Sequence, residues 1–434
     1  MKKSMIFKIL NIGIIFLYIS FFPITYSSNI FDSLLVLFFS IGLIIKSRKN
    51  LFLLIIMIFI FYSNYSIVVG EYLFVAQLGV PMTEVRTIEI YGLSIRIMLL
   101  FMSIIFIFYE GKKISLRNNA IIPNENDISF ILCFILLVLM FIFGINRGNR
   151  SAYTVRISPL FEYSKFVFIF LYYFSGNSKM KKILGLALLL VFVIQDAFYG
   201  GRITSMQLLI MCAITYYSKK LTFKKVLIFA FFGIFLNVFV GSIRHYASLD
   251  VFDFGKMIEN LFAGLFVFDT ATFAYYASAT HVAAVDVFSI SIRLQSLFQF
   301  IITLLTGYIQ GFTKSDVTLF VQREAFFNFG GGLLPTHFFF WLGWIGVIII
   351  ALIVVALFNW EWDKSETSKL FFLAFVISVP RWYLYSPNQL FRGTFIMMFF
   401  LIICFRIFRS LISKNIIITD KGEYEECQIK NKPT

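Results

Sequence analysis

Arginine is the residue type that gives this sequence its most specific chemistry. A guanidinium group is planar, permanently charged and able to hold a phosphate through two parallel N–H donors, whereas lysine offers only a point charge. Under the membrane topology argued below, the arginines of the outward loops and helix mouths are Arg86, Arg147, Arg150, Arg156, Arg202, Arg244, Arg293, Arg323, Arg381 and Arg392. For any single arginine there is an alternative explanation: a short basic loop can be tolerated once the neighbouring helices fix the topology. As a set, they predict a site for an anionic ligand.

Two of these arginines follow a glycine within three residues, each at a predicted helix boundary. Arg202 ends the run Tyr199-Gly200-Gly201-Arg202, where two glycines allow a ligand to approach the backbone closely. Arg244 lies in Gly241-Ser242-Ile243-Arg244-His245, where a predicted helix leaves the apolar region. Each has a structural alternative, because Asp196 could neutralise Arg202 and Arg244 could be an anchor that extends its charge to the membrane surface. Both are candidates for binding phosphate groups.

A third group of candidate residues lies between Arg323 and His337. An imidazole or a carboxylate near arginines is a candidate proton acceptor, so His337 and Glu324 are candidate bases. A lone histidine at a helix mouth is also often only a hydrogen-bonded interfacial residue. The glycine triplet 330–332 is either a flexible start to the next helix or, less in keeping with the apolar residues that follow it, a phosphate cradle.

Several cofactor and metal motifs are absent from the sequence. There is no Walker A loop and no GxGxxG, which indicates no nucleotide or dinucleotide site. The three histidines are far apart, and the four cysteines (Cys133, Cys212, Cys404 and Cys427) show no metal-binding spacing and no disulfide pattern. We therefore expect neither a metal nor a cofactor.

The elements that hold these residues must be membrane helices. Of 434 residues, 59% are hydrophobic and 14% are charged, and the mean hydropathy is +0.86, which excludes an ordinary soluble globule. Twelve apolar segments are long enough, or nearly so, to cross a bilayer as helices. Their approximate ranges are 5–22, 30–45, 51–69, 93–109, 128–145, 161–177, 183–199, 203–217, 226–241, 335–358, 369–386 and 391–408.

Lysine-rich clusters fix the expected orientation, because short cytoplasmic loops accumulate positive charge. If both termini are cytoplasmic, all of these clusters fall on the cytoplasmic side: Lys2/Lys3, Lys46–Lys49, Lys112–Arg117, Lys179–Lys182, Lys219–Lys225, Lys364/Lys369 and Arg406–Lys414. The arginines of the candidate site then face outward. The net charge of +15 therefore reports topology and anionic lipid, and no nucleic-acid partner is expected.

One outward segment, 242–334, is much longer than a simple connection between helices. It contains apolar stretches near 258–276 and 287–309, and the turn expected between them, 278–286, contains no Lys or Arg. We therefore expect re-entrant or surface-lying helices. Polar residues recur at helical spacing in the second stretch, as in an interfacial amphipathic helix, and a polar stripe inside a spanning bundle is the alternative. The expected organisation is a nine-helix region (1–241), this loop (242–334), a three-helix region (335–408) and a cytoplasmic tail (409–434).

These features together resemble the bacterial oligosaccharide repeat-unit polymerases, that is, the Wzy-type O-antigen or capsule polymerases. The resemblance rests on the twelve-helix layout, the Gly-Gly-Arg turn at 200–202, Arg244 at a helix exit and the large outward loop. It also includes the run Phe329-Gly-Gly-Gly-Leu-Leu-Pro-Thr-His337 and the following Trp341–Val347. In the related O-antigen ligases an asparagine follows the histidine, whereas this sequence has Phe338.

The resemblance implies an all-α polytopic fold similar to the C-type membrane glycosyltransferases (GT-C-like). It implies a multi-pass enzyme of the bacterial cytoplasmic membrane that acts at the outer face on glycans linked to undecaprenyl pyrophosphate. Such enzymes transfer the growing chain from its carrier to a new carrier-linked repeat unit, without a nucleotide sugar. Membrane lipid, a chain-length regulator and a flippase would be the expected partners.

The expected residue roles follow from this chemistry. Cleavage of the bond between the anomeric carbon and the pyrophosphate leaves negative charge on the leaving group, which arginines can stabilise without a metal. We expect Arg202, Arg244 and Arg323 to bind the pyrophosphates, with His337 or Glu324 as the base. A weaker role, in gathering the carrier or an acidic glycan, is expected for Arg147, Arg150, Arg156, Arg381 and Arg392.

Three other functions remain open. A flippase for the same lipid-linked glycan would also be a polytopic protein that accommodates pyrophosphate, although transporters commonly show internal repeats and charges in mid-membrane segments. An O-antigen ligase would differ only in its acceptor, the lipid A core. A membrane scaffold would give no reason for the outward arginines.

Overall fold

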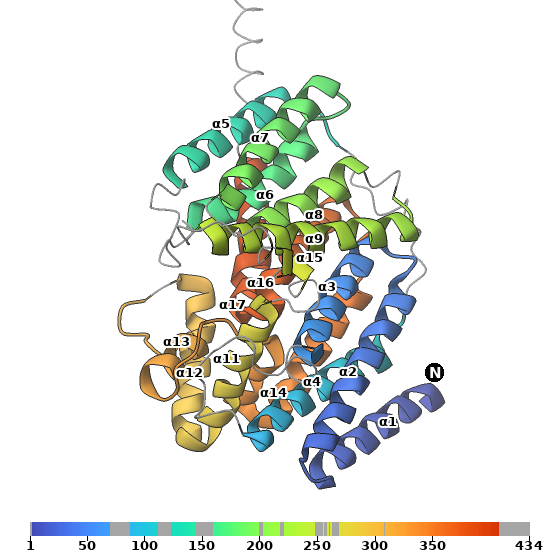
Figure 1. The fold of residues 1–434 in the computed structure, drawn as a ribbon. Helices are drawn as coiled ribbons and strands as arrows, with labels where there is room; N and C mark the ends of the chain where they lie inside the picture. Colours follow the sequence, from blue (N-terminus) through green and yellow to red (C-terminus); the bar gives the residue numbers. More distant parts are fainter. Residues whose placement is uncertain are drawn as a thin grey trace, which may run out of the picture.

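The computed structural model describes residues 2–69, 87–111, 123–144, 159–198, 203–217, 221–247, 255, 258–259, 261–262, 269–307 and 309–407. Within these residues the chain is entirely helical (Figure 1). The first nine helices are α1 (Lys2–Phe21), α2 (Tyr26–Ser47), α3 (Leu51–Val68), α4 (Ile88–Phe108), α5 (Asp127–Gly144), α6 (Pro159–Phe174), α7 (Lys179–Phe198), α8 (Ile203–Tyr217) and α9 (Phe223–Ala247). The later ones are α11 (Asp269–Val287), α12 (Ile290–Thr306), α13 (Val317–Glu324), α14 (Leu334–Asn359), α15 (Glu366–Ile377), α16 (Val379–Leu384), α17 (Pro387–Leu390) and the π-helical turn η5 (Phe391–Ile396).

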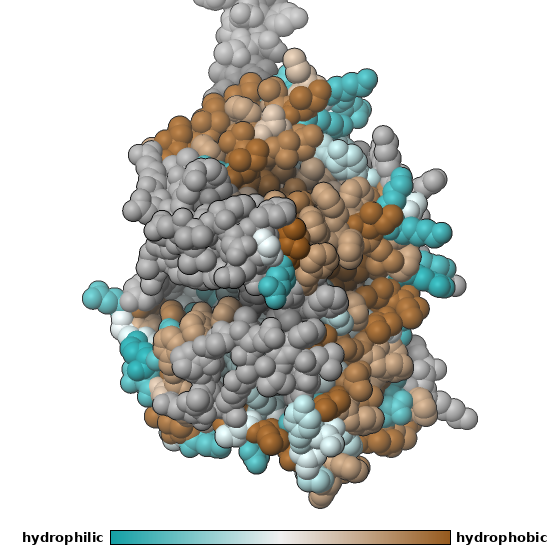
Figure 2. Space-filling view, in the orientation of Figure 1, coloured by the Kyte–Doolittle hydropathy of each residue, from teal (hydrophilic) through white to brown (hydrophobic). Residues whose placement is uncertain are grey.

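Six of the described helices are long and apolar enough to cross a bilayer. They are α2, α3, α4, α5, α14 and the segment Pro387–Ile407. Large hydrophobic side chains are exposed along many of the helices, and Figure 2 shows them covering much of the visible surface, with hydrophilic groups gathered mainly at its edges. Such a surface is typical of a multi-pass helical membrane protein. The other six segments expected to span are also helical at least in part, and a total of twelve spans stays a prediction.

The eleventh expected segment, 369–386, is not one continuous helix. The helix α15 ends at Ile377, and a short second helix, α16, begins after Ser378. Pro380 lies in the first turn of α16 and cannot donate the hydrogen bond that would continue α15. The break turns the chain, and it is this turn that carries Arg381.

The turn expected at residues 278–286 is instead helical, within α11. The sequence of this stretch is rich in alanine and contains neither glycine nor proline, so the backbone has no reason to break there. The chain changes direction later, at Phe288–Ser289, before α12 begins. Beside α14, Figure 1 shows α11, α12 and α13 grouped at one side of the bundle.

The helix α12 turns its polar side inward. Ser296 and Gln299 are buried; the indole of Trp341 donates to Ser296 Oγ at 3.0 Å, and Lys314 N donates to Gln299 Oε1 at 2.9 Å. The opposite face exposes a row of large apolar residues, Ile290, Leu294, Phe298, Ile301 and Leu305. We call this row the α12 ridge. The polar stripe of this stretch faces the protein, and whether α12 spans the bilayer or lies in the interface stays a prediction.

A buried ion pair fixes the start of the chain against α4. Arg96 Nε lies 3.1 Å from Asp32 Oδ2, with both side chains at most 2% exposed, and Tyr18 donates to the other carboxylate oxygen at 2.7 Å. The remaining guanidinium donors bind the backbone carbonyls of Ile19, Phe22 and Pro23. Because a buried charge needs such partners, the turn between α1 and α2 is held at the third turn of α4.

Lysine-bearing helix ends gather at one end of the bundle, which we call the basic end. Lys46, at the end of α2, donates to backbone carbonyls at the end of α4, and Asn359, at the end of α14, donates to Phe108 O at 3.1 Å. The α1–α2 turn contacts the start of α4 at the opposite end. This arrangement agrees with the alternation expected from the lysines, and which end faces the cytoplasm stays a prediction.

The orientation can be measured with single cysteines in a variant whose natural cysteines are replaced by serine. Ser27, in the first turn of α2, and Asn177, between α6 and α7, are both exposed. They lie at opposite ends of the bundle. We expect Ser27→Cys to react with an impermeant maleimide in cells whose outer barrier is opened, and Asn177→Cys to react only after the cytoplasmic membrane is permeabilised. The reverse result would invert the orientation.

The Asp32–Arg96 pair predicts a stability effect. Asp32→Ala leaves a guanidinium buried without a counter-charge, which is expected to cost about 3–5 kcal/mol of unfolding free energy, measured by denaturation in detergent. The double variant Asp32→Leu/Arg96→Met should recover most of this loss. Asp127→Ala is the control, because that carboxylate is 72% exposed where it pairs with Lys181, and its loss should be much smaller. Equal effects of Asp32→Ala and Asp127→Ala would contradict the prediction.

Candidate functional site

Two clusters of buried polar side chains lie at the end of the bundle opposite the basic end. One, the arginine cluster, consists of Glu162, Lys165, Gln207 and Arg381. The other, the histidine cluster, consists of His281, Thr318, Thr336 and His337. The second lies at the start of α14, whose far end reaches the basic end.

The arginine cluster joins α6, α8 and α16. Arg381 Nε lies 2.9 Å from Glu162 Oε1, and its Nη2 donates to Oε2 at 3.3 Å, so the guanidinium faces both carboxylate oxygens. Lys165 is completely buried one helical turn after Glu162; its ammonium group lies 3.9 Å from Glu162 Oε1 and donates to Gln207 Oε1 at 3.1 Å. One carboxylate thus serves two cations, which leaves the cluster itself with a net positive charge.

Asp196 ties α7 to the first turn of α8. Its Oδ2 accepts hydrogen bonds from Ser205 N and Ser205 Oγ, both at 2.8 Å. This carboxylate therefore satisfies a free amide at the start of a helix. From the sequence, Asp196 was considered as a partner that neutralises Arg202. Arg202 lies outside the described residues.

The histidine cluster is a pair of rings enclosed by threonine hydroxyls. The ring centroids of His281 and His337 are 4.5 Å apart, and both side chains are at most 1% exposed. His281 Nε2 lies 3.1 Å from Thr318 Oγ1, and that hydroxyl donates to Gly331 O. His281 Nδ1 lies 3.4 Å from Thr336 Oγ1, which donates to Leu333 O at 2.9 Å, so each ring nitrogen faces a hydroxyl that already donates to a backbone carbonyl.

His337 has a different environment from its neighbour. The backbone carbonyl groups of Gly332 and Tyr385 lie close to its ring. Neither ring nitrogen makes a hydrogen bond of normal geometry among the described residues. The ring of His337 is therefore buried next to polar backbone groups, while its two nitrogens lack hydrogen bonds of normal geometry among the described residues.

The glycine triplet allows close packing between segments. All three glycines have positive φ angles, between +82° and +141°. Gly332 N donates to Leu384 O at 2.9 Å and Gly330 N donates to Asn328 Oδ1 at 3.0 Å, so two of the three amides are already used inside the protein. A Cβ atom on Gly332 would overlap both histidine rings.

Tyr385 connects the two clusters. Its ring lies under the guanidinium of Arg381, with 4.9 Å from Cζ to the ring centroid, and its carbonyl group lies beside His337. The preceding residue, Leu384, binds the glycine triplet through its carbonyl oxygen. The Arg381–Glu162 pair and the histidine pair thus both contact the end of α16 and the Tyr385 that follows it.

Arg392 lies on η5 and is half-buried. Its guanidinium fills the space beside Gly307, where an added Cβ atom would lie 2.7 Å from Nη2. Arg381 and Arg392 both act electrostatically on Tyr163 of α6. Among the described residues no carboxylate forms an ion pair with Arg392, in contrast to Arg381.

The other residues expected from the sequence are not brought together in the described part of the chain. Arg323 and Glu324 pair with each other at 2.5 Å near the end of α13, each about half exposed, and neither bonds to His337. Arg244 belongs to α9, but its side chain lies outside the description. Arg147, Arg150, Arg156 and Arg202 also lie outside the described residues.

Glu162, Gln207 and His281 were not among the site residues expected from the sequence. A signal existed for Glu162, because an acid three residues before Lys165 in an apolar segment is unusual and often functional. The described residues contain no group of three or more His, Cys, Asp and Glu side chains arranged to hold a metal.

Comparison of the chain with family models, with curated proteins and with solved structures finds no match.

The packing of the glycine triplet predicts unequal effects of alanine at two positions. Gly332→Ala combines an unfavourable φ of +141° with overlap of the histidine rings, whereas Gly330→Ala has open space and suffers only the backbone strain at +87°. We expect Gly332→Ala to lower the melting temperature in detergent clearly more than Gly330→Ala. Equal shifts would show that the histidines do not occupy the space beside Gly332.

Proposed function

We propose that this protein polymerises undecaprenyl-pyrophosphate-linked oligosaccharide repeat units into a surface polysaccharide, O-antigen or capsule, at the outer face of the bacterial cytoplasmic membrane. The proposal includes a twelve-span, GT-C-like bundle with both termini in the cytoplasm. The observation that carries it is the half-buried guanidinium of Arg392, which has no carboxylate partner among the described residues and lies beside the end of the α12 ridge.

The α12 ridge and Arg392 match the two parts of a polyprenyl pyrophosphate. The ridge exposes apolar residues from Ile290 to Leu305, and the helix then ends at Gly307, against the guanidinium of Arg392. A long apolar chain along the ridge would bring its anionic head to this cation. The guanidinium lies on a π-helical turn, a distortion that is frequent at functional sites.

Arg381 differs from Arg392 in its availability. Because Glu162 neutralises Arg381, its role in the proposal is to hold α16 and Tyr385 in position. Arg202 and Arg244 remain proposed pyrophosphate ligands, together with Arg323, whose pair with Glu324 is exposed enough to exchange its partner. The resemblance of the 200–202 turn and of the 329–337 run to the polymerases supports these roles.

The proposed reaction transfers the glycan chain in one displacement. An acceptor hydroxyl attacks the anomeric carbon, the bond from that carbon to the pyrophosphate oxygen breaks, and undecaprenyl pyrophosphate leaves with its charge stabilised by arginine. The hydroxyl proton passes to a base. Glu324 is the more accessible of the two candidate bases, because its side chain is 46% exposed and His337 is buried. Both residues stay candidates for the base.

A flippase for the same glycan is the alternative that an observation favours. Glu162, Lys165 and Arg96 are ionisable groups buried inside helices, a feature of transport routes as well as of structural pairs. An O-antigen ligase would share the whole donor site and differ in the acceptor.

The test is a reconstitution of the purified full-length protein in liposomes with the lipid-linked repeat unit. A polymerase should produce a ladder of lengthened products without an added nucleotide sugar. Arg392→Ala should lower the rate on the order of 10²-fold and Arg392→Lys should recover only part of it, because a point charge replaces the planar fork. Arg48→Ala, an exposed arginine at the basic end, is the matched control and should leave the rate unchanged.

Two outcomes would reject the polymerase, and a third would reject the site proposed for it. Translocation of the repeat unit across the bilayer without lengthening would identify a flippase. Lengthening only when a lipid A core acceptor is added would identify a ligase. A ladder unaffected by Arg392→Ala would remove the observation on which the site proposal rests.

A further inference from the structure

The helix α14 is kinked at Gly343, which has φ +61° and ψ −145° inside an otherwise helical run. The kink brings Phe338 close to Gly346, where an added Cβ atom would overlap Phe338 O. In a regular helix these two residues would lie about 12 Å apart along the axis. Because both the positive φ and the close approach favour glycine, the sequence itself specifies the kink. The helix therefore has a first part, 334–342, and a second part, 344–359.

Arg293, near the start of α12, binds the backbone of α14 just before this kink. Its Nη1 donates to Phe340 O at 3.3 Å. A kink disturbs the hydrogen bonds of the preceding helical turn, and a carbonyl with poor partners inside an apolar bundle is costly. A side-chain donor from α12 thus supports α14 at the place where its own ladder is disturbed.

The first part of α14 holds α12 by two further contacts. Trp341 Nε1 donates to Ser296 Oγ at 3.0 Å, and the indole packs on Phe300 with 4.6 Å between ring centroids. Arg293, Ser296 and Phe300 follow one another at helical spacing, on a side of α12 that faces away from the α12 ridge. These contacts fix how α12 is tilted against the kinked helix.

The far end of α12 meets η5 through packing. Phe300 lies 6.4 Å from Phe391 between ring centroids, and Gly307 lies against the guanidinium of Arg392. Gly307 follows Arg293 by 14 residues, which is about 21 Å along a helix. Over that length, a small change of tilt at Arg293 moves the end of α12 noticeably relative to Arg392.

We propose that Arg293 is a positioning residue of the proposed anion site. By binding Phe340 O at the kink, it sets the tilt of α12 and therefore the place of the α12 ridge and of Gly307 relative to Arg392. Among the described residues the half-buried Arg293 pairs with no carboxylate, and its Nε makes no hydrogen bond, so the bond to Phe340 O is the polar contact that it makes there. The inference rests on the proposed function for the ligand, whereas the tilt of α12 can be measured without it.

The test is a distance measurement on the full-length protein in lipid nanodiscs, in a variant whose natural cysteines are replaced by serine. Spin labels are attached to Leu305→Cys, at the far end of α12, and to Ile349→Cys, on the second part of α14; both positions are exposed. Arg293→Ala should shift or broaden the distance distribution, and Arg293→Lys, which keeps a donor for Phe340 O, should restore most of it. If Arg293→Ala does not fold, Arg293→Met keeps the apolar stem and removes only the donors.

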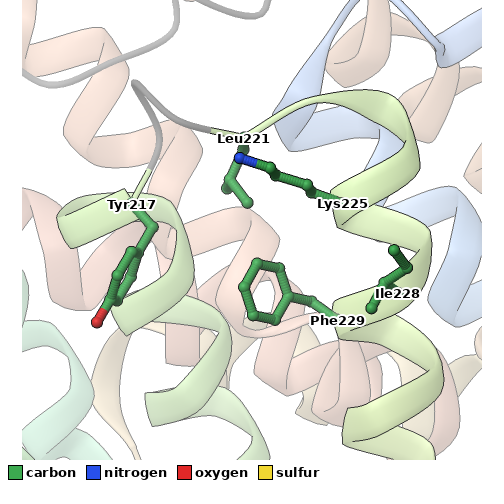
Figure 3. A pocket seen from close by; sticks show the side chains of 5 residues that line it. All are labelled: Tyr217, Leu221, Lys225, Ile228 and Phe229. Carbon is green, nitrogen blue, oxygen red and sulfur yellow. The ribbon is translucent and has the colours of Figure 1, made fainter.

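Two controls separate this contact from general effects. Gln295→Ala lies on the same helix, where the exposed Gln295 accepts a hydrogen bond from Lys314 Nζ at 2.6 Å. Phe229→Ala removes a ring from a groove of about 250 Å³ between α8 and α9, whose lining includes no residue of α12 or α14 (Figure 3). Neither control should change the distance between the labels.

The rate of ladder formation gives the functional readout. Arg293→Ala should lower it roughly tenfold, because the site is misplaced but its ligand-binding groups remain, and Arg293→Lys should recover most of the rate. An unchanged distance in the Arg293 variants, or an equal change in Gln295→Ala, would overturn the positioning role even if the polymerase is confirmed. A shifted distance with an unchanged rate would overturn it too, since Arg293 would then serve the fold alone. If the unaltered protein forms no ladder, the proposed function itself fails, and the role of Arg293 in that site fails with it.

Discussion

A guanidinium largely withdrawn from solvent requires a counter-charge, and the Arg381–Glu162 pair, with each side chain 15% exposed, meets this requirement where α6 and α16 approach each other. Much of the candidate site depends on this contact. It fixes the end of α16, where the Leu384 carbonyl holds the glycine triplet and the carbonyl of the next residue, Tyr385, lies beside His337. The histidine pair in turn occupies the space that the absent side chain of Gly332 leaves open.

The same requirement separates the arginines into two kinds. Arg96 forms an ion pair with Asp32, and Arg381 forms one with Glu162. Each pair joins segments that are distant in sequence. Arg392 is half-buried and forms no ion pair with a carboxylate among the described residues, and the proposed function assigns it to the ligand for that reason. Arg381 and Arg392 are the same residue type, and both were expected on the outward side. The sequence therefore could not tell the paired arginine from the one without a carboxylate partner among the described residues.

The helical framework could be predicted from the sequence because apolar length is a local property. All twelve expected segments are at least partly helical, and the errors occur where a local signal was overlooked, at Pro380 and in the alanine-rich 278–286 stretch. The site could be predicted only in part. The pairs Glu162–Arg381 and His281–His337 join residues far apart in the chain, and nothing in the spacing of either pair indicates which helices pack together. His337 was expected as a titratable group near arginines at the start of a predicted helix, whereas its partner His281 had no such signal.

The orientation of α12 has a consequence for how the 242–334 segment can be studied. Its polar residues are satisfied by Trp341 and by the backbone of Lys314, while its apolar ridge faces away from the protein. Cut out of the chain and placed in water, this segment would lose the indole partner supplied by α14 and would expose the ridge to solvent. It is therefore not a soluble outer domain that could be expressed alone. Its fold needs both the bundle on one side and an apolar medium on the other.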